Sequence, residues 1–364
     1  EAEGERIATE QEMGEYTAKL MKELGFAEVE FHYIAENRPN VVGIHYQDPN
    51  FPCLAFEAHL DTVGTEGMSI DPFDPQIKDD KIFGRGSCDT KGSLVAMLFA
   101  AKKIIEEKLP INLLILATSA EETGCQGAEF WDLSRWNPQA IIIGEPTQNQ
   151  PVIAHKSHLT FELICRGKAA HGSRPEAGDN AILKAAKLLL FIEKEILPRF
   201  DNSEKGNFER GNTLSIGTIK GGSKPNIVPD FCSIYFDMRI TPCSENNGEE
   251  ILNVILKEAE EKLGFNIELG YKHISPAMKS AAGKKILSRI EEGMEKLSLP
   301  CKAGTVAYCT DGGVLSQKGY TCIILGPGDI LNAHAAVEFL EIEQLKEAAE
   351  IYLETARQIA LKGL

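Results

Sequence analysis

The chain has 364 residues, of which 43% are hydrophobic and 25% charged, so a folded globular protein is predicted rather than a disordered, collagen-like or coiled-coil chain. Its 38 Lys and Arg are outnumbered by 54 Asp and Glu, and the resulting net charge of -16 argues against nucleic acid as a partner, because phosphate binding requires clustered cations. At roughly 100–200 residues per domain, this length predicts two domains or one large domain with an insertion.

Cysteine usage and hydropathy bear on the compartment. The nine cysteines are scattered and never spaced as a C-x-x-C pair, which favours reduced, mostly buried thiols in a cytoplasmic protein. No apolar run reaches the roughly 18 residues of a transmembrane helix, so no membrane association is expected. The sequence begins at Glu1 rather than Met, and we expect the natural chain to extend before it.

The first part of the chain has the pattern of an α/β fold. Apolar residues at helical spacing predict a helix over 5–24, and short apolar runs follow at 28–34, 41–46 and 53–58. A helix is predicted at 91–108. The apolar stretches 111–120 and 140–144 are typical of strands buried on both faces of a mainly parallel sheet. Such a sheet lies between helices and carries its sites at the carboxyl ends of the strands.

The pattern changes at about residue 160. Between 160 and 275 the order β-α-β-β-α-β, with helices at 177–197 and 246–263, indicates a ferredoxin-like unit with an antiparallel sheet. The α/β pattern then resumes with a helix at 279–297, a strand at 321–328 and a helix at 341–361. We therefore predict a three-layer α/β domain with a mixed, mostly parallel sheet, formed by 1–159 and 276–364 and interrupted by a ferredoxin-like α+β domain at 160–275.

Candidate site residues appear where the predicted strands end. The run AFEAHLDTVG ends in His59 and Asp61, which are two apart and so point to the same side of a strand. Such a carboxylate can orient a metal-binding imidazole, although a polar strand end is the simpler interpretation of the two residues alone. Asp89, in IFGRGSCDTKGSL, precedes a helix, where an Asp is more often an N-cap than a ligand.

Further carboxylates and a histidine follow the buried strands. Glu121 and Glu122 come directly after the strand at 111–120, and adjacent carboxylates that are buried need protonation or a cation. One of them could coordinate a metal while the other served as general base; an exposed pair that opens a loop is the alternative. Glu145 follows the strand at 140–144, and His334 lies in a loop after the strand at 321–328, where a lone histidine is usually without a special role.

Considered together, these residues favour a metal centre. Each follows a strand or begins the next helix, so the fold would gather them along one rim of a single sheet: His59, Asp89, Glu121, Glu122, Glu145 and His334. Two histidines with several carboxylates and no cysteine suit two divalent cations, Zn²⁺ above all, with Co²⁺ or Mn²⁺ as substitutes. A carboxylate that bridges two cations about 3.5–4 Å apart suits the activation of one water for attack on a carbonyl.

The motifs HLDTVG, GRGSCDTKG, EETG, GEPT, HGSRPEAGDNAI and GPG…AH resemble, in order and over essentially the whole chain, the co-catalytic dizinc aminoacylase and exopeptidase family. This family includes acetylornithine deacetylase, succinyl-diaminopimelate desuccinylase, aminoacylase and the glutamate carboxypeptidases. The resemblance implies two Zn²⁺ per chain, held by His59 and Glu145 on one side, by Glu122 and His334 on the other, and bridged by Asp89. It further implies that Asp61 supports His59, and that Glu121 is the general base that deprotonates the bridging water and returns the proton to the leaving amine.

Residues of the inserted domain match the family as well. His171, in KAAHGSRP, matches a histidine that reaches into the active site, from its own or the partner subunit, to stabilise the oxyanion. The alternative is a histidine that caps a turn. Arg239 and Asn226 match positions that grip the substrate carboxylate and neighbouring backbone, although Arg239 could also be an exposed charge at a strand edge. In the family this domain is a lid that often forms a dimer interface, so a homodimer is one expected state.

Within the family, the strings HKSH, AYCTDGG and LGPGDILNAH most resemble acetylornithine deacetylase, an arginine-biosynthesis enzyme that converts N-acetyl-L-ornithine and water into L-ornithine and acetate. The resemblance departs at Asp311, where that enzyme carries Glu, in a loop expected near the substrate side chain.

Other candidate substrates are succinyl-diaminopimelate, other acyl-amino acids and the peptides of a dipeptidase or carboxypeptidase. A ligand-binding member without turnover should have lost a ligand or Glu121, and none is missing. A dinucleotide oxidoreductase is disfavoured because GRGSCDTKG does not fit G-x-G-x-x-G.

Overall fold

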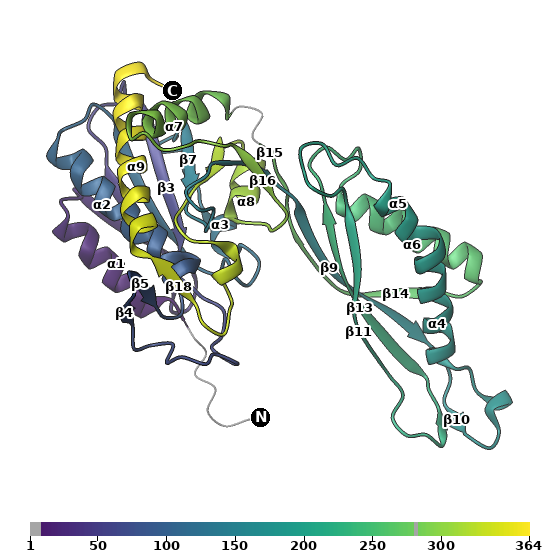
Figure 1. Ribbon diagram of the computed structural model, residues 1–364. Coiled ribbons are helices and arrows are strands. Elements are labelled where there is room, and N and C mark those ends of the chain that lie inside the picture. Colours follow the sequence, from purple (N-terminus) through teal and green to yellow (C-terminus); the bar gives the residue numbers. More distant parts are fainter. Residues whose placement is uncertain (1–8, 280–282) are drawn as a thin grey trace. The chain divides into compact units, whose positions relative to one another are not determined.

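The computed structural model describes residues 9–279 and 283–364 and forms two compact units (Figure 1). Unit 1 combines the chain up to Ala154 with Met278–Gly304 and Thr310–Leu364, and unit 2 comprises His155–Ala277 and Thr305–Cys309. The inserted domain predicted from the sequence spans 160–275. Unit 2 is thus an insertion in the chain of unit 1.

Unit 1 is built on a mixed sheet in the order β1-β2-β6-β3-β7-β17-β8-β15, with β16 beside β8. Its strands are β1 (Glu28–Ala35), β2 (Arg38–His45), β3 (Cys53–His59), β6 (Asn112–Thr118), β7 (Ala140–Ile143), β8 (Val152–His155), β15 (Met278–Lys279), β16 (Gly304–Val306) and β17 (Cys322–Ile324). The central strands β6, β3, β7 and β17 run parallel, whereas β1, β2 and β8 pair antiparallel. Every residue of β3 and β6 is buried, as expected for strands covered on both faces.

Helices cover this sheet and complete its core. They are α1 (Gln11–Glu23), α2 (Gly92–Glu106), α3 (Gln126–Phe130), α7 (Lys284–Lys296), α8 (Asp311–Gln317) and α9 (Ile342–Lys362). Helix α9 packs between α2 and α7 (Figure 1), and the three share one hydrophobic core with the central strands. A small sheet in the order β18-β5-β4 joins β18 (Phe339–Glu341) to β5 (Lys81–Phe83) and β4 (Gln76–Lys78). This small sheet brings residues near 85 and 338 together.

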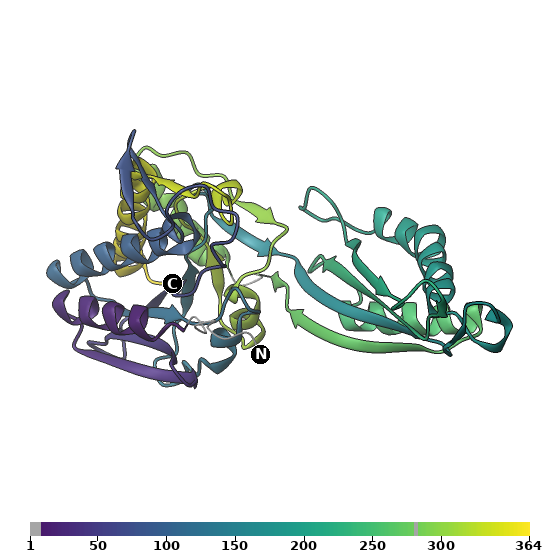
Figure 2. The ribbon, with the colours of Figure 1, turned by 90° about the horizontal axis from the view of Figure 1, so that it is seen from below.

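Unit 2 has its own antiparallel sheet and its own core. The sheet has the order β11-β13-β9-β14, from β9 (Ser157–Arg166), β11 (Thr213–Gly221), β13 (Phe231–Ile240) and β14 (Ile267–Ser275). Helices α4 (Ala181–Phe191) and α6 (Gly248–Leu263) pack on it, as Figure 2 shows, and α5 (Leu197–Asp201) follows α4. A two-stranded ribbon pairs β10 (Ala170–His171) with β12 (Ile227–Val228). The predicted fold class, a mostly parallel α/β sheet interrupted by an antiparallel α+β unit, is confirmed.

Some predicted helix bounds differ from the structure for local reasons. The helix predicted at 177–197 begins only at Ala181, because the Asn180 side chain accepts from the backbone N–H groups of Ile182 and Leu183 and so starts the helix there. Of the helix predicted at 5–24, residues 5–8 lie outside the described residues. Of the one predicted at 279–297, residue 279 belongs to β15, 280–282 lie outside the described residues, and the helix starts at Lys284.

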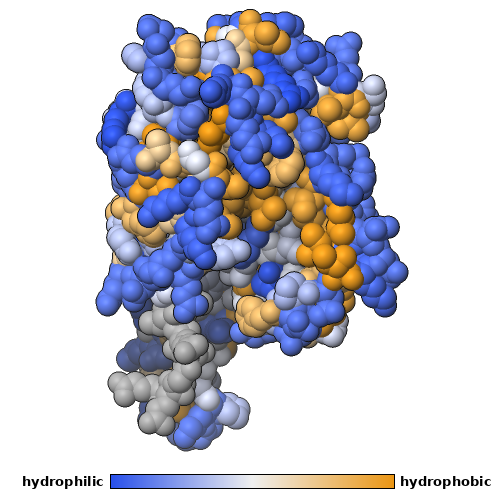
Figure 3. Space-filling view, turned by 90° about the vertical axis from the view of Figure 1, so that its left-hand side faces the viewer, coloured by the Kyte–Doolittle hydropathy of each residue, from blue (hydrophilic) through white to orange (hydrophobic). Residues whose placement is uncertain are grey.

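The surface agrees with the acidic, polar composition. Most of the face of the molecule that Figure 3 shows is hydrophilic, with apolar residues in patches between polar ones. Among residues 9–279 and 283–364, no helix combines the length and apolar character needed to cross a membrane.

Candidate metal centre

The parallel strands of unit 1 deliver the candidate site residues to one edge of the sheet. Strand β3 ends on His59, β6 is followed by Glu121 and Glu122, β7 by Glu145, and the loop after β17 carries His334. The turn before α2, residues 87–91, adds Asp89. Because these strands run in the same direction, their carboxyl ends meet, and the structure brings all six residues together.

Asp89 is the centre of this cluster, since it contacts both histidines through different oxygens. His59 Nε2 lies 3.0 Å from Asp89 Oδ1, and His334 Nε2 lies 3.2 Å from Oδ2. Glu145 Oε1 is 4.0 Å from His59 Nε2, and Glu122 Oε1 is 3.0 Å from His334 Nε2. The ligand atoms of His59, Asp89 and Glu122 all lie within 4.8 Å of one another. Two groups of donors, one around each histidine, therefore share Asp89.

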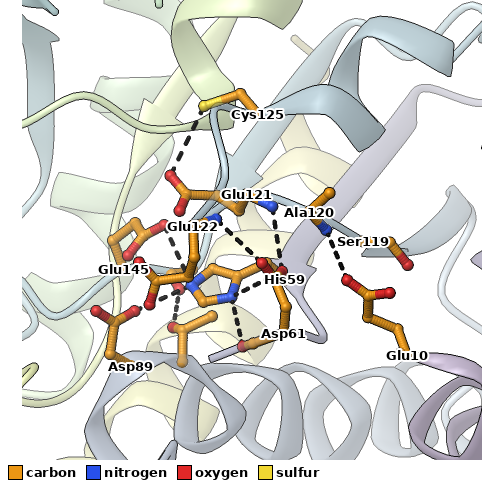
Figure 4. Close-up of polar contacts among 12 residues, drawn as sticks. Glu10, His59, Asp61, Asp89, Ser119, Ala120, Glu121, Glu122, Cys125 and Glu145 are labelled. Atoms are coloured by element: carbon orange, nitrogen blue, oxygen red, sulfur yellow. Dashed lines mark hydrogen bonds and ion pairs between the residues drawn. The ribbon is translucent and has the colours of Figure 1, made fainter. Parts of the chain in front are cut away.

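Asp89 does not act as an N-cap. Its side chain makes no capping hydrogen bond, and the residue that precedes α2 is Lys91. Asp89 is only 7% exposed, and its carboxylate contacts the imidazole of His59, as Figure 4 shows, and that of His334. The ligand interpretation of Asp89 therefore has the geometric support that the cap interpretation lacks.

Asp61 contacts His59 and also the backbone that carries Glu121 and Glu122. His59 Nδ1 lies 3.0 Å from the Asp61 carbonyl oxygen and 3.6 Å from its Oδ1. An Nδ1–H that donates to this carbonyl leaves Nε2, which faces Asp89, as the ring's metal-binding atom. The Asp61 carboxylate accepts from the N–H groups of Glu121 (3.1 Å) and Glu122 (3.0 Å). Because β3 ends at His59, Asp61 lies beyond the strand, and the same-side strand geometry assumed from the sequence does not apply.

The pKa shifts of the clustered side chains indicate a site suited to bound cations. Burial raises the pKa of Glu121 to about 8 and holds the pKa of Glu145 well above its usual range. Burial also acts to raise the pKa of Asp89, but hydrogen bonds from His334 and His59 outweigh it and keep that pKa low. The hydrogen bonds of His334 to Asp89 and Glu122 raise its pKa to about 10. Closely spaced, poorly solvated carboxylates of this kind suit bound divalent cations.

Sequence reasoning missed a buried ion pair that holds Asp89 in place. Glu338 is completely buried, and its Oε1 accepts from the N–H groups of Cys88 (2.9 Å) and Asp89 (3.1 Å). Its Oε2 accepts from Arg85 Nη1 at 2.6 Å. Glu338 lies in AAVEFL, where nothing distinguishes it from a surface acid, and its partners are about 250 positions away, so no local signal could have found it.

Asp311, in the AYCTDGG loop expected near the substrate side chain, lies beside Glu121. It is 1% exposed at the start of α8, where Thr310 caps the helix, and the ligand atoms of Asp311 and Glu121 lie within 4.8 Å of each other. Burial, followed by the nearby carboxylate of Glu57, holds the pKa of Asp311 well above its usual range. A side chain buried in this way faces Glu57 rather than solvent. Glu57 could have been singled out from the sequence, because it is an acidic residue within the apolar run at 53–58.

The candidate residues of unit 2 form two separate groups. His171 is exposed, with Nδ1 2.8 Å from Ser173 Oγ, and it lies beside Asn226 because the Gly172 N–H donates to the Asn226 carbonyl at 2.7 Å. Arg239 on β13 makes a two-point contact with Asp237, Nε to Oδ1 at 2.9 Å and Nη2 to Oδ2 at 3.0 Å. A ligand carboxylate would have to share this guanidinium with Asp237.

Comparison with known proteins defines the class. Residues 55–358 match the model of peptidase family M20/M25/M40, so the chain belongs to this family, a family of metal-dependent hydrolases. The aminopeptidase PepT from Bacillus cereus is a similar solved structure, with 23% identity, 96% of this chain and 93% of that chain covered, and a TM-score of 0.76.

Two further solved structures show the same fold. A tripeptidase from Staphylococcus aureus has 23% identity, with 97% of this chain and 94% of that chain covered and a TM-score of 0.79. An M20 family metallo-carboxypeptidase from Sulfolobus solfataricus has 19% identity, with 96% and 94% covered and a TM-score of 0.80.

Proposed function

We propose that this protein hydrolyses the amide bonds of small peptides at a two-metal centre around Asp89. The observation that carries the proposal is the shared carboxylate, each oxygen of which faces a different histidine. A carboxylate in this position, with a further acid beside each imidazole, is the donor arrangement that a pair of cations needs.

The donor set fits two divalent cations. His59 and Glu145 would hold one ion, Glu122 and His334 the other, and Asp89 would contribute to both. Nitrogen and oxygen donors without thiolate suit Zn²⁺, with Co²⁺ and Mn²⁺ as substitutes. When bound, the ions supply Lewis-acid polarisation of the substrate carbonyl and make a water more acidic.

Glu121 is the proposed proton carrier. It adjoins the ligand Glu122 on the same segment, and its Oε1 contacts the thiol of Cys125 at 3.8 Å rather than either histidine. Burial favours the protonated form of this carboxyl, whereas cations held by the neighbouring ligands would favour the carboxylate, which could then take a proton from the attacking water and pass it to the leaving amine. His171 is proposed to stabilise the oxyanion, from its own or the partner subunit, and its exposed imidazole is consistent with such a role.

Short peptides are the preferred substrates because the family is one of peptidases and the similar structures include an aminopeptidase, a tripeptidase and a carboxypeptidase. Arg239 and Asn226 are proposed to contact the peptide's carboxylate and backbone, since a half-buried Arg fork matches a carboxylate. Deacetylation of N-acetyl-L-ornithine is the second candidate, and it is favoured by the motifs HKSH, AYCTDGG and LGPGDILNAH.

A substrate panel tests this function. Dipeptides, tripeptides, N-acetylated and C-amidated peptides, N-acetyl-L-ornithine and succinyl-diaminopimelate would be assayed with added Zn²⁺ or Co²⁺. We expect cleavage of the free short peptides, and we expect Glu121→Gln to lose roughly 10²–10⁴-fold in kcat while metal analysis still finds two ions per chain. Cleavage of N-acetyl-L-ornithine alone would favour the deacetylase, and no cleavage of any compound would favour a binding protein.

We further propose a homodimer that forms through unit 2. Strand β11 is an edge of its sheet and exposes the apolar side chains of Ile216 (39%) and Ile219 (49%), which is unusual for an edge that remains in water. Ile219→Glu should convert the dimer to a monomer in light scattering, whereas Tyr271→Glu, on the opposite edge strand β14, should not. A wild-type protein that is monomeric at all concentrations would contradict this proposal.

A further inference from the structure

The segment that carries Glu121 and Glu122 is held by an unusual set of hydrogen bonds. Successive backbone N–H groups, from residue 119 to residue 122, each donate to a side-chain oxygen rather than to another backbone group. Figure 4 shows the contacts of Ala120, Glu121 and Glu122. The pairs are Ser119 to Asn40 Oδ1 at 2.9 Å, Ala120 to Glu10 Oε1 at 3.2 Å, Glu121 to Asp61 Oδ1 at 3.1 Å and Glu122 to Asp61 Oδ2 at 3.0 Å. We call residues 119–122 the corner segment.

The corner segment needs these acceptors because of its backbone conformation. Strand β6 ends at Thr118, and Ala120 then has a φ of +61°, a left-handed conformation that residues with a Cβ rarely adopt. Ala120 is also completely buried, so its N–H group has no water to bond with. A conformation of this kind persists only where the surroundings fix it.

Glu10 is the acceptor that meets Ala120, and it is itself fixed. Its side chain is 4% exposed. Arg38 donates hydrogen bonds to both of its carboxylate oxygens, from Nε to Oε2 at 2.8 Å and from Nη2 to Oε1 at 2.5 Å. A two-point contact with Arg sets the plane of the carboxylate as well as its position. Figure 4 shows the Glu10 carboxylate directed at Ala120.

Consecutive residues of β2 support the first part of the corner segment. Arg38 holds Glu10, the Pro39 carbonyl accepts from Ser119 Oγ at 2.6 Å, and Asn40 accepts from the Ser119 N–H. Asn40 also donates to the Gly127 carbonyl at 2.8 Å, beyond the corner segment. Residues 119 and 120 are thus supported through a strand that contributes no ligand to the cluster, whereas the N–H groups of Glu121 and Glu122 are held by Asp61.

We propose that Glu10, oriented by Arg38, is a positioning residue that fixes the direction of Glu121 by holding the Ala120 N–H group. The proposal rests on the proposed role of Glu121 as the proton carrier. Asp61 accepts from the N–H groups of both Glu121 and Glu122, and the Glu122 side chain alone has further support from His334. Loss of Glu10 should therefore affect proton transfer more than metal binding.

Hydrogen exchange and kinetics together test this inference, in the full-length, metal-loaded protein. In Glu10→Ala, peptides that cover 119–122 should exchange faster, and kcat per metal-loaded site should fall roughly 10–100-fold with KM nearly unchanged, because a small misplacement of a catalytic group has this effect. Glu10→Gln should recover part of the kcat, since its amide oxygen can still accept from Ala120. Glu107→Gln is the matched control, because Glu107 forms a two-point pair with Arg357 that is unconnected to the corner segment.

Several results would overturn the inference. Unchanged exchange at 119–122 in Glu10→Ala would show that Glu10 does not hold the segment. Faster exchange with a wild-type kcat would show that its hold does not position the base. Equal losses in the control variant would indicate a general effect of losing an ion pair. If the wild-type protein cleaved no amide, the proposed function would fail, while the exchange experiment would still decide whether Glu10 anchors the corner.

Discussion

Asp89 faces both histidines because another carboxylate holds its backbone. Glu338 accepts from two successive N–H groups, those of Cys88 and Asp89, and is fixed in turn by Arg85, whose Nη2 donates to the Gly64 carbonyl at 3.0 Å. The whole arrangement is buried, with 4% of the Arg85 side chain and none of the Glu338 side chain exposed. The position of the shared carboxylate therefore depends on an ion pair that does not itself belong to the donor set.

We predict that Glu338→Gln weakens metal binding. The amide oxygen can replace one acceptor, but the charge that Arg85 faces is lost, and the backbone at Asp89 loosens. Changes in residues that support a metal ligand typically cost 10–100-fold in metal affinity, and we expect a loss of that order. Competition with a chromogenic chelator measures it. The control is Glu341→Gln, because Glu341 is an exposed partner of Lys81. Equal metal affinities in the two variants would contradict the prediction.

The candidate metal ligands could be found from the sequence because each follows a buried strand or begins a helix after one. The residues that support them could not, because their chemistry depends on distant partners. Glu10 contacts Ala120 at a separation of 110 positions, and Glu338 contacts Asp89 at 249. Asp311 was visible as an acid in a loop, but the sequence does not reveal that its helix start is buried against Glu57.

At the scale of elements, the sequence predicted most helices and strands, because their apolar periodicity is strong. Two helices, α4 and α6, start later than predicted because a side chain caps the backbone. Helix α6, predicted from 246, starts at Gly248 because Asn247 forms a capping box with Glu250: the Asn247 side chain accepts from the Glu250 N–H at 3.0 Å, and the Glu250 carboxylate accepts from the Asn247 N–H at 2.9 Å.

We predict that Asn247→Ala lowers the free energy of unfolding of unit 2 by about 1 kcal/mol, because the first turn of α6 loses its acceptor. Urea unfolding followed by circular dichroism measures the change. Lys257→Ala, at an exposed position within the same helix, should have little effect. A capped and an uncapped helix of equal stability would show that packing of α6 on the sheet determines where it starts.

At the scale of the whole molecule, each unit has its own hydrophobic core, one around β3, β6 and α9 and the other around β9, β13 and α4. The candidate metal ligands all belong to unit 1. A ligand that binds only the folded state stabilises the part of the chain that holds it.

We predict, therefore, that removal of metal destabilises unit 1 alone. Differential scanning calorimetry should show two transitions, and a chelator should lower only the one assigned to unit 1. Metal at 100 times its dissociation constant adds about 2.7 kcal/mol to the free energy of unfolding of the unit that binds it. The chelator should lower the transition of unit 1 by the corresponding amount. Hydrogen exchange assigns the transitions. A single transition that shifts as a whole would contradict independent units.

The insertion of unit 2 affects the order in which the protein is completed during synthesis. Strand β17, at Cys322–Ile324, pairs with both β7 and β8, and Tyr352 of α9 bonds to the Leu325 carbonyl at 2.6 Å while its ring lies 5.2 Å from that of Phe56. The strands made first on the ribosome thus lack a central neighbour and a covering helix until the last part of the chain emerges. Nearly all of unit 2 is one continuous segment, so its strands and helices can pack together before the last part of the chain is synthesised. We expect the unit that is begun second to be finished first, and the metal-binding edge to form last.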